Sequence, residues 1–171
     1  MKYITGKREP REWTEEERKL IEEAILFVQL PPDNNTYNKI ALFLNKATKA
    51  DYVVIGLTEI EEDKKFIRTL AHIHGQNVLD NMTYSTLHTP CEHVLGRNFV
   101  YYPEKLQELF PLDDYLRVIG MHSYMAVALN DREDNSIGLL SLLHKEKIAR
   151  PELAEHLLFM MASLLEENLD L

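Results

Sequence analysis

Two pairs of β-branched and aromatic segments, each pair joined by a short polar connection, constrain the fold of this chain more than any other feature. Residues 52–60 have the composition of a strand, and a few acidic residues separate them from a second strand predicted over residues 65–74. Residues 123–129 and 136–143 repeat this arrangement around a polar, turn-forming connection. Connections this short join antiparallel strands, so the sequence predicts two β-hairpins.

Three longer segments carry the signals of helices. Thr14 and Glu17 form a capping box, and the apolar residues behind them recur at helical spacing until a pair of prolines. A second helix is predicted to start near residues 35–36, and a long C-terminal helix opens at Pro151. Helices packed on an antiparallel sheet make an α+β domain, which is the predicted fold class.

The segment between the two hairpins is less regular. Residues 76–97 have no clear period and are expected to form a loop that ends in one helical turn. A stretch of this length inside a compact domain is usually functional or poorly ordered. Residues 99–101 are predicted to form a brief strand. Short helices are expected to start at Pro103 and to span residues 112–119, the latter closed by Gly120.

Size and charge exclude several classes of protein. The 171 residues suit one domain, and we assign residues 1–13 to an N-terminal arm and residues 14–171 to that domain. A net charge of −9 argues against binding nucleic acid, whose phosphates attract basic surfaces. The sequence has no apolar run long enough to cross a membrane and no signal-peptide core, so we expect no membrane association. The single cysteine excludes an internal disulfide and fits the reducing cytoplasm, where we expect the protein to reside.

Motifs of common enzyme classes are missing from the sequence. It contains no phosphate-binding loop, no dinucleotide fingerprint and no nucleophile elbow. Asp113 and Asp114 lie at a predicted helix start, where carboxylates stabilise the helix dipole. We interpret them as structural and predict that the protein is not an enzyme.

The richest set of reactive side chains surrounds Cys91. A cysteine near a helix start and beside His88 and His93 can have a lowered pKa and react, whereas most lone cysteines are small buried hydrophobes. The same residues, together with His72 and His74, resemble a scattered metal site. Neither a helical histidine pair nor a second cysteine accompanies them, so we predict no metal site.

Five segments, in this order along the chain, resemble a GAF domain, a small-molecule-sensing module of signalling proteins. They are Thr89-Pro-Cys-Glu-His-Val94, Tyr101-Tyr-Pro-Glu104, Phe110-Pro-Leu-Asp-Asp-Tyr-Leu116, Ser123-Tyr-Met-Ala-Val-Ala-Leu129 and Ile137-Gly-Leu-Leu140. The resemblance covers about Asp33 to Leu169. It implies a GAF/PAS-like central antiparallel sheet of five or six strands, with helices packed on it and the terminal helices packed together. It also implies a ligand pocket between one sheet face and residues 76–120.

The sequence lacks the residues that three specialised activities of that family require. Its methionine sulfoxide reductases use several cysteines, whereas this chain has one. Its light-sensing members attach a bilin through a cysteine followed by a histidine, and here Glu92 separates Cys91 from His93. Its cyclic-nucleotide-binding members carry an Asn-Lys-x-Phe-Asp signature, which Asn38-Lys39 does not continue. The cofactor, if any, stays unknown.

Six residues are predicted to contact the ligand: Tyr84, His88, Thr89, Cys91, Tyr101 and Tyr124. A tyrosine offers a small molecule both a ring and a hydroxyl, although it can also pack at a sheet margin with its hydroxyl in water. Thr89 is chosen because it lies at the turn that the resemblance places beside the pocket.

The C-terminal helix suggests a partner. Five consecutive apolar residues, Leu157 to Met161, cover most of its circumference, so it needs a second partner besides the sheet. The N-terminal helix is one candidate and a second copy of the chain is another, and we favour a homodimer.

The predicted function is a non-catalytic regulatory sensor domain. It would bind an unidentified small molecule and pass a signal through dimeric terminal helices to an output domain, as in two-component signalling or transcription regulation. The alternatives are a dimerisation or scaffold module without a ligand, and a redox sensor based on Cys91.

Overall fold

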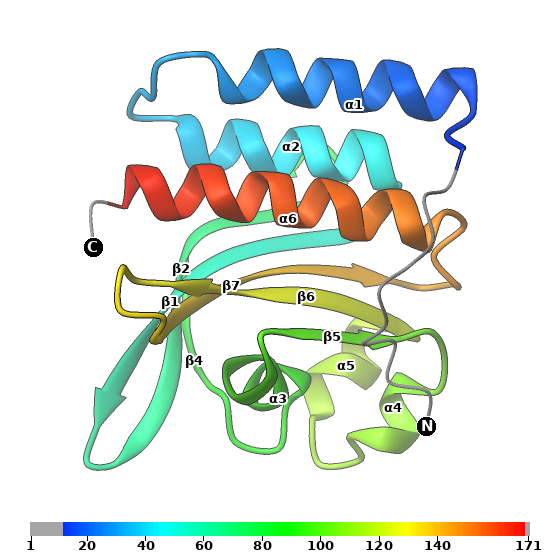
Figure 1. Cartoon of the computed structure of the whole chain (residues 1–171). Helices are drawn as coiled ribbons and strands as arrows, with labels where there is room; N and C mark the ends of the chain where they lie inside the picture. The colour runs from blue at the N-terminus through cyan, green and yellow to red at the C-terminus, as the bar shows by residue number, and fades with distance from the viewer. Residues whose placement is uncertain (1–11, 170–171) are drawn as a thin grey trace.

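The computed structural model describes residues 12–169, which contain six helices and seven strands (Figure 1). Most of the predicted N-terminal arm, residues 1–11, lies outside the described residues. In chain order the elements are α1 (Glu15–Val28), α2 (Thr36–Thr48), β1 (Tyr52–Glu61), β2 (Lys64–His74), β3 (Asn77–Val78), β4 (Thr83–Ser85), α3 (Pro90–Arg97), β5 (Phe99–Tyr102), α4 (Leu106–Leu109), α5 (Asp114–Ile119), β6 (Ser123–Asn130), β7 (Ser136–His144) and α6 (Pro151–Asn168).

All seven strands of the described chain form one antiparallel sheet in the order β3-β2-β1-β7-β6-β5, and β4 also pairs with β2. The two predicted hairpins are present as β1–β2 and β6–β7, and pairing of β1 with β7 joins them. The α+β class with a central antiparallel sheet is therefore confirmed. The sheet has more strands than the five or six expected, because β3 and β4 add short pairings at the outer edge of β2.

Several predicted helix boundaries are confirmed. Thr14 and Glu17 exchange both hydrogen bonds of a capping box, and Pro151 lies in the first turn of α6. Gly120 ends α5 with a φ of 71°, a left-handed conformation that glycine adopts without strain. The helix expected at Pro103 starts later, at Leu106.

Residues 76–97 are more regular than predicted. Instead of a loop with one helical turn, they contain β3, β4 and the eight-residue helix α3. The two strands are too short to produce an apolar period, and they form because β2 offers its free edge. Pro90 occupies the first turn of α3, where a missing N–H costs nothing.

The sheet separates two apolar cores, because successive side chains of its central strands point to opposite faces. One face packs against α2 and α6, which α1 covers from outside, and the other face packs against the segment that contains α3, α4 and α5 (Figure 1). Val53 and Ile55 of β1 belong to the first core, whereas Val54 between them belongs to the second. The second core contains the candidate site.

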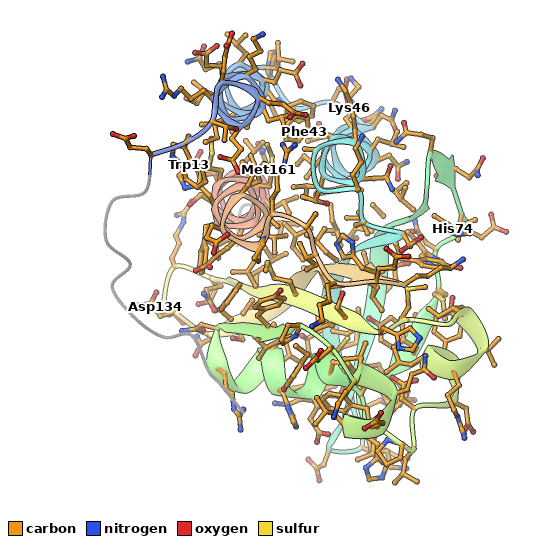
Figure 2. The ribbon with its side chains drawn as sticks, turned by 90° about the vertical axis from the view of Figure 1, so that its right-hand side faces the viewer. Trp13, Phe43, Lys46, His74, Asp134 and Met161 are labelled. Atoms are coloured by element: carbon orange, nitrogen blue, oxygen red, sulfur yellow. The ribbon has the colours of Figure 1, made fainter. Side chains whose placement is uncertain are left out.

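The terminal helices pack together, as predicted. Seen nearly along their axes, α1 lies over α2 and α6 (Figure 2). The ring of Phe27 on α1 lies 5.7 Å from that of Phe43 on α2, and the ring of Trp13, just before α1, lies 5.4 Å from that of His156 on α6. Helices α2 and α6 thus lie on the sheet, and α1 covers them from outside.

Most of the apolar surface of α6 is covered within a single chain. Leu157, Leu158 and Met161 are fully buried between the sheet and the other two helices, and only Phe159 of the five apolar residues is largely exposed, at 44 %. The observation that favoured a dimer therefore has an explanation inside one chain. The dimer itself stays a prediction.

Candidate ligand-binding site

A cavity of about 290 Å³ lies in the second core, between the sheet and the segment that runs from β4 to α5. It is partly open to solvent, and apolar atoms make most of its wall. The residues that line it are Val54, Thr69, His72, Met82, Tyr84, Ser85, Thr89, Pro90, Cys91, Asp113, Tyr115, Leu116, Tyr124, Ser141 and Leu143.

The floor of the cavity is a row of side chains that crosses neighbouring strands. The strand register pairs His72 of β2 with Val54 of β1, and Val54 with Ser141 of β7. Leu143 lies two residues beyond Ser141, on the same face, and pairs with Tyr124 of β6. All five side chains are buried. The central strands therefore place a rigid, mixed polar and apolar surface under the cavity.

Tyr84, Cys91 and Tyr124 form a hydrogen-bonded chain along the wall. The sulfur of Cys91 lies 3.4 Å from the hydroxyl oxygen of each tyrosine. Burial is the main reason that the pKa of each phenol lies well above its ordinary value, and the nearby thiol adds to it. Burial also raises the pKa of the Cys91 thiol. All three groups are therefore neutral at physiological pH and act as neutral hydrogen-bonding groups.

Asp113 brings the only formal charge to the cavity wall at neutral pH, among the lining residues that the structure describes. Its carboxylate caps α5 by accepting a hydrogen bond from the Leu116 N–H at 3.4 Å. Partial burial raises the pKa of Asp113, and this carboxylate in turn raises the pKa of Tyr84 and of Cys91. The charge of Asp113 therefore acts on the same wall as the hydrogen-bonded chain.

His72 brings a hydrogen-bond acceptor to the floor. Its Nδ1 donates to the carbonyl oxygen of Asp80 at 3.3 Å, which fixes the proton of the neutral ring on Nδ1. Burial lowers the pKa of His72, so the ring is neutral at physiological pH and Nε2 carries a lone pair. The ring of Tyr52 lies next to that of His72, with the centroids 6.1 Å apart, and stacks more closely on His74, at 4.3 Å.

Four of the six predicted ligand contacts line this cavity. Tyr84, Cys91 and Tyr124 form its hydrogen-bonded chain, and Thr89 lies beside them at the start of α3. The hydroxyl of Thr89 donates to the carbonyl oxygen of Thr86 at 2.7 Å. The geometry thus brings these four residues together.

The other two predicted contacts lie elsewhere. His88 is exposed, with a φ of 62°, and is not part of the cavity lining. Tyr101 packs against the core of the terminal helices, on the opposite face of the sheet. Its neighbour Tyr102 faces the core that holds the cavity and hydrogen-bonds His93 at 2.5 Å. Successive side chains of a strand point to opposite faces of the sheet, so Tyr101 and Tyr102 of β5 belong to different cores.

Several lining residues were not among the predicted ligand contacts, and His72, Ser141 and Asp113 are the most polar of them. The sequence pattern indicates for His72 only a place in a scattered metal set, and for Asp113 only a role at a helix start. For His72 and Ser141 the missing information is the strand register, which aligns them with Val54. For Asp113 a signal existed, because it lies inside the segment expected to cover the pocket.

Among residues 12–169, no group of three His, Cys, Asp or Glu side chains is arranged to hold a metal ion. No helix within the same range is long and apolar enough to cross a bilayer.

Comparison with solved structures reveals neighbours that cover nearly the whole chain. The chromophore-binding domain of Stigmatella aurantiaca phytochrome P1 matches with a TM-score of 0.68 and 12 % identity, over 93 % of this chain and 62 % of its own. That of an unusual bacteriophytochrome from R. palustris matches with a TM-score of 0.70 and 12 % identity, over 94 % and 63 %. A GAF domain of A. aeolicus, in an inactive state, matches with a TM-score of 0.62 and 11 % identity, over 89 % and 94 %.

These neighbours define the class of fold: the chain has a GAF-type fold, as the sequence resemblance implied. It spans less than two thirds of each of the two phytochrome chains and nearly all of the A. aeolicus domain. No protein-family model and no curated protein matches the sequence. The likeness therefore rests on three-dimensional structure.

Proposed function

We propose that this chain is the ligand-binding sensor domain of a regulatory protein and is not itself an enzyme. The observation that carries the proposal is the cavity between the sheet and the segment from β4 to α5, in a chain with a GAF-type fold. Two of the similar structures are chromophore-binding domains of phytochromes, which supports a small-molecule role for this fold. We infer a cytoplasmic location from the single, unpaired cysteine.

The cavity volume suits a compact ligand. At about 290 Å³ it lies near the lower end of the ~300–1,000 Å³ range of small-molecule sites. It is about twice the size of a ~150 Å³ apolar cavity that holds benzene. A molecule with one or two fused rings would fill this space. The apolar walls would bury its rings, and the hydroxyls of Tyr84 and Tyr124 would orient it.

The two alternative functions receive less support. A scaffold module whose pocket is filled by its own side chains would have no cavity of this volume. A redox sensor needs an accessible thiol with a lowered pKa, whereas Cys91 is buried and its thiol pKa is raised.

Signal transmission would use the strands that the cavity shares with the helices. Tyr124 of β6 lines the cavity, and the next residue, Met125, packs in the core of the terminal helices. On β7, Ser141 likewise lines the cavity, and the next residue, Leu142, packs in the core of the terminal helices. A ligand that shifts these strands would therefore shift α6. We propose that α1 and α6 pass this shift to an output domain through a homodimer, in a two-component system or a transcription regulator.

A cavity-filling variant tests the ligand-binding role. We expect one- and two-ring aromatic compounds, titrated into the ¹⁵N-labelled chain, to shift the amide resonances of Tyr84, Cys91 and Tyr124. In Val54→Phe the larger ring would occupy the floor, so these shifts should disappear.

The matched control makes the same substitution at a site remote from the cavity. Val78 of β3 is 54 % exposed and does not line the cavity, so Val78→Phe should bind as the wild type does. Native mass spectrometry of the purified chain would give the mass of any ligand retained from the cell. The proposal would be wrong if no compound shifts the cavity resonances, or if Val54→Phe binds as well as Val78→Phe.

A further inference from the structure

The polar groups of the cavity are unevenly distributed. Most of the wall is apolar, and the hydroxyls and the thiol along it are neutral. Asp113 is the charged exception, and no lysine or arginine appears among the described residues that line the cavity. The electrostatic potential inside the cavity is therefore negative, in a chain whose net charge is already −9.

Asp113 is a half-buried carboxylate whose hydrogen-bond partners are backbone N–H groups and which has no cation beside it in the described structure. Its carboxylate accepts backbone N–H groups at the start of α5 and forms no ion pair within the described part of the chain. Its neighbour Asp114 is exposed and forms an ion pair with Arg117. Partial burial opposes the charged form of this carboxylate and the backbone N–H groups offset only part of that cost, so a cation beside it would stabilise the charge further. A cationic ligand would supply that charge.

The His72 ring is a second group in the cavity that can accept a hydrogen bond. His72 holds its own proton on Nδ1 against the Asp80 carbonyl oxygen, which leaves Nε2 as an acceptor. His72 comes from β2 and Asp113 from the segment over the cavity, so a bound molecule meets hydrogen-bond acceptors from both the floor and the cover.

We propose that the ligand of this site is a compact, flat, mostly apolar molecule with a protonated amine, and that Asp113 forms the ion pair with this amine. The inference rests on the proposed function and adds the chemical class of the ligand. The apolar wall would bury the ring system, and the amine would satisfy the unpaired carboxylate. An anionic ligand would be repelled by the same carboxylate.

Three probes of similar shape separate the effect of charge from the effect of ring burial: naphthylmethylamine, naphthalenemethanol and naphthoate. Each is titrated into the wild-type chain and followed by the amide shifts of the cavity residues. We expect the amine to bind about tenfold more tightly than the alcohol, the size of effect that one charge-assisted hydrogen bond gives. Naphthoate should bind most weakly.

Asp113→Asn removes the charge and keeps the helix cap, because asparagine caps helices as well as aspartate does. In this variant the affinity for the amine should fall about tenfold and the affinity for the alcohol should stay unchanged. Asp114→Asn makes the same change in charge one residue away and should leave both affinities unaltered. If Asp113→Asn fails to fold, Asp113→Ser supplies a second neutral cap.

The outcomes distinguish this inference from the proposed function. Equal binding of amine and alcohol, or tightest binding of naphthoate, would overturn the ligand class and leave the sensor role standing. Loss of the amine preference in Asp114→Asn but not in Asp113→Asn would also overturn it. If none of the three probes shifts the cavity resonances at millimolar concentration while another one- or two-ring compound does, the ligand class is wrong and the sensor role stands. If no compound shifts them, the sensor role fails as well.

Discussion

The thiol of Cys91 is expected to react slowly in the folded protein. Its sulfur is buried between the hydroxyls of Tyr84 and Tyr124, and burial raises its pKa, so little thiolate exists at neutral pH. An aromatic disulfide reagent should therefore label the native chain at least about a hundredfold more slowly than the unfolded chain in urea. Because the chain has one cysteine, the absorbance change reports this site alone.

The same measurement decides on the redox alternative. Complete labelling of the native chain within the time needed by the unfolded chain would show that the thiol is accessible. A redox role for Cys91 would then regain support. A ligand bound in the cavity should slow the labelling further, since Cys91 lines the cavity wall.

His144 is expected to make the fold sensitive to mild acid. This side chain is buried, its Nε2 has no hydrogen-bond partner in the described structure, and burial lowers its pKa from 6.5 to about 4. Between these two pH values the unfolded chain binds a proton that the folded chain does not, so stability falls as the pH drops from 6.5 towards 4. The loss over the whole window is about 3 kcal/mol.

Urea unfolding of the wild type and of His144→Phe, at neutral pH and midway between pH 4 and 6.5, measures this effect. Phenylalanine fills the site without a titratable group, so the stability of this variant should depend less on pH. His122→Ala is the control, because His122 is exposed. Identical pH dependence of the wild type and His144→Phe would contradict the assignment.

At the scale of secondary-structure elements, strands β1 and β7 meet at two glycines. A Cβ atom added to Gly138 would overlap the carbonyl oxygen of Gly56 on the neighbouring strand. Gly138→Ala should therefore destabilise the sheet by about 2 kcal/mol or more, because backbone has to move. Gly96 in α3 is helical and has open space around its Cβ position, so Gly96→Ala should stabilise the chain by about 0.5 to 1 kcal/mol.

Urea unfolding at neutral pH compares the two alanine variants directly. The pair controls for the general effect of replacing glycine by alanine, since only one of the two positions is crowded. A Gly138→Ala variant as stable as Gly96→Ala would show that the two strands can separate at little cost.

The elements were predictable wherever one residue pattern dominated. The hairpins and the long helices follow from alternation, polar connections and caps such as Thr14 with Glu17, all of which act locally. The short strands β3 and β4 were not predictable, because they depend on the free edge of β2 rather than on their own sequence.

The site was predictable only in part for the same reason. Tyr84, Cys91 and Tyr124 stand out by residue type and by the family resemblance, and the cavity contains all three. His72 and Ser141 line the cavity because each pairs with Val54 in the sheet. The sequence alone does not determine this strand register. Tyr101 faces the opposite core because β5 alternates, and composition cannot tell which of two adjacent tyrosines points inward.

At the scale of the whole molecule, the sheet lies between α1, α2 and α6 on one side and α3, α4 and α5 on the other (Figure 1). The cavity lies on the second side. The outer side of α1 leaves apolar residues exposed: Leu26 by 65 %, Ile25 by 46 %, and the following Leu30 by 62 %. If the chain dimerises through its terminal helices, this side of α1 is the surface that a second copy would cover.

An arginine at Leu26 tests this arrangement. Sedimentation equilibrium at micromolar concentration should give a dimer for the wild type and a monomer for Leu26→Arg, because a charge inside an apolar interface loses its hydration. Val118 on α5 is more exposed still, at 81 %, and lies on the other side of the sheet, so Val118→Arg should remain a dimer. A monomeric wild type would mean that packing of α1 against α6 within one chain buries enough of their apolar surface. A dimer broken only by Val118→Arg would move the interface to the cavity side, where a ligand could control assembly directly.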